Sequence, residues 1–135
     1  MKYFLCSALI AVLAVAAVAG QSKHKITVTF DYDFAHQPPC STDANEKEHD
    51  KVCVQQFIVY DISAGLAQRT KLMTIPVPGD AHGMVKGISG TSPLLLFESG
   101  QHLIAVVAQA PNGYESDPNR CEVWITIPDS SPDQH

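Results

Sequence analysis

The feature that most constrains the fold is a strict alternation of side chains between Lys25 and Phe34, in the stretch KITVTFDYDF. Apolar and aromatic residues occupy every second position, and lysine, threonine or aspartate stands between them. A period of two places the two sets on opposite faces of a β-strand, whereas a helix would mix them. We therefore predict a half-buried strand. It ends before Pro38 and Pro39, because proline cannot donate a ladder hydrogen bond.

The remaining chain predicts further strands and no helix, because no segment of useful length shows helical periodicity. Residues 52–63 are rich in β-branched and aromatic side chains and are apolar on both faces around Phe57–Tyr60, which indicates a central strand. The next strand carries Pro76 and Pro78 two positions apart, which suits a sheet edge. Residues 79–93 are rich in glycine and serine and predict a loop with one short strand. The expected strands are 25–34, 52–63, 68–78, 84–88, 100–111 and 121–128, with a short apolar segment at 94–100. Such a series predicts an all-β sandwich.

The first twenty residues differ from the rest of the chain. One lysine precedes an apolar stretch at residues 3–18, which ends in the small residues Ala17-Val18-Ala19. This order is typical of a secretory signal peptide, with cleavage after Ala19 or Gly20. A transmembrane anchor is the alternative, but the stretch is short for a span of about 20 residues. We therefore predict a signal peptide (1–20), one sandwich domain (21–128) and a flexible C-terminal tail (129–135), in a protein secreted to a periplasm or to the medium without a membrane span.

Charge excludes two classes of partner. Without Lys2 the chain has eight basic and fourteen acidic residues, a net charge of −6. Such a surface repels nucleic acid and anionic lipid, so we expect neither as a partner. The acidic segment Asp43–Asp50 includes His49 but lacks the glycine and the distal glutamate of a calcium-binding loop. We interpret it as a solvated loop, and we expect no metal and no cofactor.

The cysteines are even in the whole chain and odd without the predicted signal peptide, which contains Cys6. We favour a disulfide between Cys40 and Cys53, since it closes a short loop and contributes ~3 kcal/mol. Pairing of Cys53 with Cys121 is the alternative. In the favoured arrangement Cys121 is a free thiol, either buried or able to link two chains into a disulfide-bonded dimer. No CxxC motif supports redox chemistry or a zinc ribbon.

The stretch GQHLIAVVAQAPNGYESDPN (100–119) resembles the sixth strand and following loop of a fibronectin type III domain. FIVYDIS and KLMTIPVPG resemble the third and fourth strands of that family. The resemblance covers most of residues 25–128 and implies a single immunoglobulin-like two-sheet sandwich. Three features depart from the family. No tryptophan stands in the second strand, so Phe30 or Phe34 must fill its volume; the first strand is reduced to QSKH; and His102 replaces a tyrosine that bonds the backbone at a corner. We expect His102 to be a satisfied corner residue.

Domains of this kind act by presenting loops or a sheet face, so the resemblance implies a non-catalytic binding module. Its partner would be an extracellular or envelope protein or polysaccharide. Our first candidate surface is the loop that carries Asn112, Tyr114 and Glu115, because an exposed tyrosine favours interfaces. The open sheet edge beside the reduced first strand is the second candidate, through strand addition.

Two alternatives stay open. One is a purely structural spacer. The other is a small secreted hydrolase-like enzyme that uses His49, His102 or Ser89, which requires a concave pocket with shifted titrating groups. The stretch GISGTSP (87–93) has Thr91 where a nucleophile elbow needs glycine, and we interpret its glycines as turn residues. We therefore predict no catalytic residue.

Overall fold

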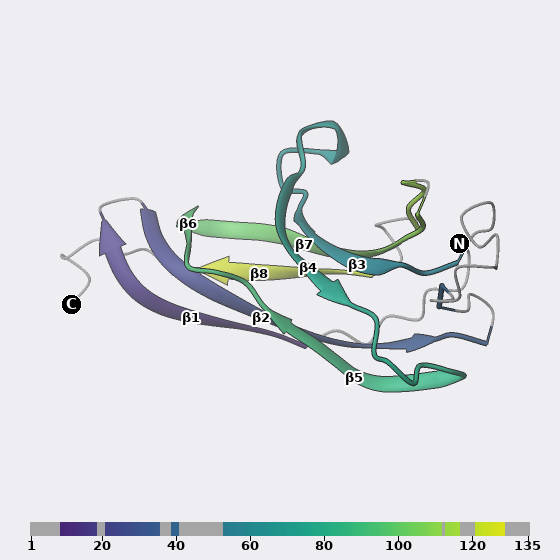
Figure 1. Cartoon of the computed structure of the whole chain (residues 1–135). Helices are drawn as coiled ribbons and strands as arrows, with labels where there is room; N and C mark the ends of the chain where they lie inside the picture. Colours follow the sequence, from purple (N-terminus) through teal and green to yellow (C-terminus); the bar gives the residue numbers. More distant parts are fainter. Residues whose placement is uncertain are drawn as a thin grey trace.

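The computed structural model of the full-length chain shows two antiparallel sheets packed face to face, which confirms the predicted all-β sandwich (Figure 1). It describes residues 9–18, 21–35, 39–40, 53–111, 113–116 and 121–128, with side chains from Lys23 onward. The first sheet contains β1 (Leu9–Val18), β2 (Gln21–Asp33) and β5 (Met84–Thr91) in that order, and β6 (Leu95–Glu98) pairs with the start of β2. The second sheet has the order β4 (Thr70–Pro76), β3 (Gln56–Asp61), β7 (Gly100–Gln109), β8 (Glu122–Ile127).

The second sheet follows the sequence pattern closely. Strand β3 lies between β4 and β7, so the strand that is apolar on both faces is central, as predicted. Its alternate residues Phe57 and Val59 face the first sheet, and Ile58 and Tyr60 are buried on the outer face. Strand β4 is an edge strand that ends at Pro76, in agreement with the prediction that proline guards this edge. A single 3₁₀ turn, Leu66–Gln68, lies in the β3–β4 connection.

The core lies between the sheets and is built on alternate residues of β2. Phe30, Tyr32 and Phe34 surround the Phe57 ring, with ring centroids 4.9, 5.2 and 6.2 Å from it. These aromatic rings form an edge-to-face cluster between the two sheets. The described members of the core cluster run from Ile26 to Ile127 and come from both sheets. A chain that begins at Gln21 would therefore keep seven strands and these core residues.

Strand β5 is longer than predicted and corrects our interpretation of its glycines. Gly87 and Gly90 lie within the strand, not in a loop. Gly87 has a φ of 74° beside a register shift in β2, and its N–H donates to Asp31 Oδ1 over 3.0 Å. Gly90 has no positive φ, but a Cβ there would lie 2.6 Å from Ile75 Cγ1 of the facing sheet. Gly87 accommodates a β-bulge, and Gly90 allows the two sheets to approach each other closely.

Strand β1 lies inside the segment predicted to be a signal peptide. It forms the edge of the first sheet and pairs antiparallel with β2, from Leu9 opposite Thr29 to Val18 opposite Gln21. The residues QSKH, predicted as a remnant first strand, instead begin β2. Removal of residues 1–20 stays a prediction. None of the helices among the described residues is long and apolar enough to span a membrane.

Candidate functional site

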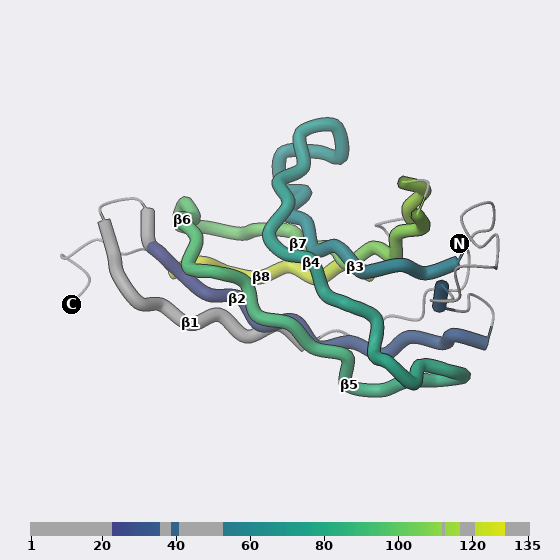
Figure 2. Tube along the Cα trace, in the orientation of Figure 1, coloured from purple at the N-terminus to yellow at the C-terminus, as the bar shows by residue number. Residues whose placement is uncertain are grey.

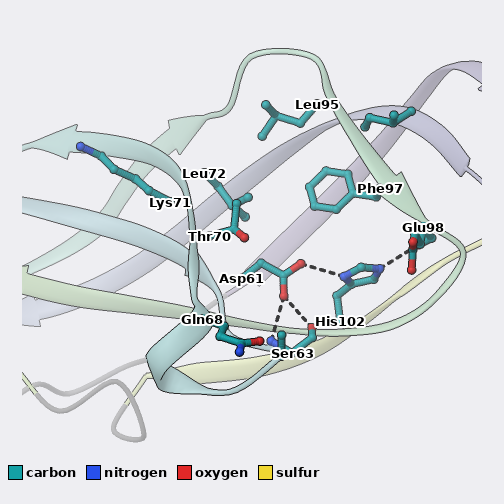
Figure 3. A pocket seen from close by; sticks show the side chains of 12 residues that line it. Asp61, Ser63, Gln68, Thr70, Lys71, Leu72, Leu95, Phe97, Glu98 and His102 are labelled. Carbon is teal, nitrogen blue, oxygen red and sulfur yellow. Dashed lines mark hydrogen bonds and ion pairs between the residues drawn. The ribbon is translucent and has the colours of Figure 1, made fainter.

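His102 stands near the start of β7, and two hydrogen bonds hold its ring. Nδ1 lies 2.7 Å from Asp61 Oδ2, and Nε2 lies 2.7 Å from the backbone carbonyl of Glu98, four residues upstream (Figure 3). The bond to Glu98 is of the type that a corner tyrosine makes. Because both partners accept, both bonds form together only when both ring nitrogens carry a proton. His102 therefore ties β7 to β3 and to the end of β6.

The neighbouring serine does not complete a catalytic triad. Ser63 donates to Asp61 Oδ1 through its hydroxyl (2.5 Å) and its backbone N–H (3.0 Å), and its hydroxyl accepts from the Leu103 N–H (2.9 Å). A nucleophilic serine must instead bond the imidazole, whose other nitrogen is oriented by the acid. Here the carboxylate stands between the serine and the histidine, so the cluster links strands and does not activate the hydroxyl.

A pocket of about 370 Å³ opens beside His102, between the β3–β4 connection and β6 (Figure 3). Leu72, Leu95 and Phe97 supply apolar walls, and Asp61, Gln68 and Lys71 supply polar groups. The volume is within the range of small-molecule sites. The concave pocket that the enzyme alternative requires is thus present at His102, but neither ring nitrogen is available to a substrate while both hydrogen bonds hold.

Ser89, the second residue of the enzyme alternative, does not line this pocket. Ser89 is exposed on β5, where its hydroxyl accepts from Thr29 Oγ1 at 3.3 Å. His49 and the acidic segment Asp43–Asp50 lie outside the described residues. Within the part of the chain that the structure describes, no group of three or more histidine, cysteine or acidic side chains is placed to hold a metal ion.

The loop predicted as a binding surface turns one residue outward and one inward. The Tyr114 side chain is 57% exposed. Glu115 lies against the outer face of the second sheet, where Oε2 accepts from the Tyr60 hydroxyl (2.7 Å) and Oε1 lies 2.9 Å from Arg69 Nη1. The Arg69 guanidinium also stacks over the Tyr60 ring, 4.3 Å from its centroid. Asn112, the third residue of this prediction, is not among the described residues.

Glu115 therefore fastens the loop to the sheet. The segment after β7 and the β3–β4 connection both rise from the second sheet, and the Arg69–Glu115 pair joins them (Figure 2). Burial and the Glu115 hydrogen bond raise the pKa of Tyr60 to about 12. Tyr60 was not singled out from the sequence, although the apolar run on both faces of its strand was the available signal. Trp124, which is 60% exposed on β8 opposite Leu103, was also missed as a surface aromatic.

The cysteines confirm one prediction, and a second one stays a prediction. Cys40 and Cys53 form a disulfide with Cα atoms 5.0 Å apart, which confirms the favoured pair and excludes Cys53–Cys121. Cys121 is only 1% exposed and is itself disulfide-bonded in the full-length chain, so the structure of this form does not test the predicted free thiol. The prediction assumed loss of residues 1–20, which changes the number of cysteines.

In comparisons with known proteins, no family model, no curated protein and no solved structure matches the chain.

Proposed function

We propose that the chain is an exported, non-catalytic binding module with a fibronectin type III-like sandwich, which presents the Tyr114 loop to a protein or polysaccharide partner. The stretches that resemble the third, fourth and sixth strands of that family correspond to β3, β4 and β7, which are neighbours in one sheet. The ring of His102 reaches the backbone carbonyl of Glu98, as a corner residue would. These two features support the proposed resemblance to the fibronectin type III family.

The observation that carries the binding proposal is the contrast between Tyr114 and Glu115. Tyr114 exposes more than half of its surface, while the next residue is fixed by a hydrogen bond to Tyr60 and an ion pair with Arg69. A large amphipathic side chain on a fastened base loses little conformational entropy on binding, which is the property of interface hot spots. Because both nitrogens of His102 are engaged, the geometry favours binding over catalysis.

Export is supported by the leader-like composition of residues 1–20 and by the Cys40–Cys53 disulfide. Disulfides persist in oxidising compartments and are rare in a reducing cytosol. We therefore expect a secreted module with this acidic surface to bind envelope proteins or polysaccharides and not nucleic acid.

The test measures how much ligand the immobilised protein and its variants retain from envelope and matrix extracts. It also measures how strongly they bind insoluble polysaccharides. Tyr114→Ala should lower retention by about tenfold or more, because hot-spot truncation costs at least about 2 kcal/mol, with no change in Tm. Trp124→Ala is the matched control, since it removes a similarly exposed aromatic from β8. Loss of retention with Trp124→Ala alone would move the surface to the sheet face. No retention of any ligand by the unmodified protein would favour a structural spacer.

A further inference from the structure

At one edge of β2, the backbone hydrogen-bonding groups are paired by β1. The Ile26 N–H donates to Ser92 Oγ and its carbonyl accepts from the Ser92 N–H, both over 2.9 Å, so the polar groups of Ile26 point toward β5. Backbone groups of successive strand residues point in opposite directions within a sheet. The N–H and C=O groups of Lys25 and Thr27 therefore point to the other edge, where β1 pairs with them.

Loss of residues 1–20 would open this edge to a single extended segment. Strand β1 ends at Val18 and β2 begins at Gln21, so cleavage at the predicted position would separate the two strands. The vacated place also borders β8 of the facing sheet, against which β1 lies. A second copy that approached edge to edge would bring its own facing sheet against β8. An isolated strand needs only the width that β1 occupies.

The charges beside the edge indicate which strand fits best. Lys23 and Lys25 are exposed on the outer face of β2, in a chain whose net charge without Lys2 is −6. In the register of the full-length chain they stand opposite Ala16 and Leu13, which carry no charge. Lysine at an edge discourages unspecific pairing, and an opposite charge directly across the ladder is stabilising. In the full-length chain β1 thus places no negative charge opposite Lys23 and Lys25, whereas a strand with acidic residues at these two positions would.

We propose that the processed chain binds, along the β2 edge, an extended antiparallel segment of a partner protein. This segment is apolar at the positions that face the core and acidic at the positions opposite Lys23 and Lys25. The inference rests on the proposed export with loss of residues 1–20, and it names a partner class and a surface distinct from the Tyr114 loop.

The first experiment uses the chain that begins at Gln21, exported with a host leader and checked for a folded core by its amide NMR dispersion. The probe is a synthetic peptide of residues 9–18 that carries Leu13→Glu and Ala16→Glu. It should shift the amide signals of β2, and it should bind about tenfold more tightly than the unsubstituted peptide. Lys23→Ala with Lys25→Ala should remove this preference. Lys71→Ala with Lys86→Ala, an equal change of charge at exposed sites on other strands, should not.

A backbone variant tests the mode of binding. Thr27→Pro removes one N–H that points out of the edge and should weaken the peptide complex, whereas Thr27→Ala should not. Equal binding by both variants, absence of binding, or a dimer of the processed chain that excludes the peptide would overturn the proposal.

The full-length chain gives an independent measurement in case the shorter chain does not fold. Leu13→Glu with Ala16→Glu in the refolded full-length chain should raise Tm by a few degrees, and Lys23→Ala with Lys25→Ala should cancel the gain. No gain would overturn the proposed charge preference. The intact mass of the exported protein shows separately whether export and leader removal occur. The Tyr114→Ala comparison shows separately whether the Tyr114 loop binds a partner.

Discussion

At the scale of single residues, the burial of Tyr60 and its hydrogen bond to Glu115 make stability depend on pH in the alkaline range. Burial is the larger cause and the Glu115 bond the smaller, and together they raise the pKa of Tyr60 from 10.0 to about 12. The unfolded chain releases this proton at lower pH than the folded chain. The contribution is therefore fully present below pH 10 and is lost as pH rises toward 12.

Tyr60→Phe should flatten this alkaline fall in the free energy of unfolding, measured by urea titration across that pH range. A residual slope is expected from Tyr32, whose pKa burial also raises. Tyr114→Phe is the control, because Tyr114 is exposed. An identical slope with and without the Tyr60 hydroxyl would contradict the assignment.

Residue types in a sequence locate candidate positions but not the direction in which each side chain turns. Tyr114 and Glu115 are adjacent in one predicted turn, and the structure sends them to different environments. The partners of Glu115 come from β3 and from the β3–β4 connection, about fifty residues away in the chain. His102 was easier to predict, because one of its partners, Glu98, is only four residues upstream.

At the scale of elements, Gly90 allows β5 to pack closely against β4. A Cβ at this position would lie 2.6 Å from Ile75 Cγ1 and 2.8 Å from Ile75 Cδ1, in a side chain that is almost fully buried. Gly90→Ala should therefore destabilise the fold by about 1–3 kcal/mol through overpacking. Ser89→Ala, next to it on the exposed face, should change stability by less than about 0.5 kcal/mol.

The contact can be assigned by a double-mutant cycle measured by denaturant unfolding. Ile75→Ala removes both Cγ1 and Cδ1, so its combination with Gly90→Ala should cost less than the sum of the single changes. Strict additivity would show that the cost of Gly90→Ala arises elsewhere in β5. This role of glycine was invisible in the sequence, because glycine- and serine-rich composition is shared by loops and by strands that approach another backbone.

At the scale of the whole molecule, the sandwich was predictable because alternation in β2 and β8 and the doubly apolar β3 each require a buried face. The sequence did not predict that Leu9–Val18 would form β1, the edge strand beside β2 in the first sheet. The composition of residues 1–20 predicts a leader, and Leu9–Val18 is also apolar enough to pair as a strand with β2. One segment thus satisfies two patterns, and its sequence does not say which form of the chain is the functional one.

The thiols distinguish these two forms. In the full-length chain Cys40 is bonded to Cys53 and Cys121 is disulfide-bonded as well, so alkylation without reductant should modify none of the three. A chain that begins at Gln21 holds three cysteines, an odd number, so one sulfur per chain cannot pair within it. The intact mass of the exported protein should therefore show a start near Gln21 together with one added alkyl group, or a doubled mass that collapses on reduction. An exported chain that keeps residues 1–20 and takes up no alkyl group would contradict the predicted leader. In that case β1 would be a permanent strand, and the β2 edge would be closed to any partner.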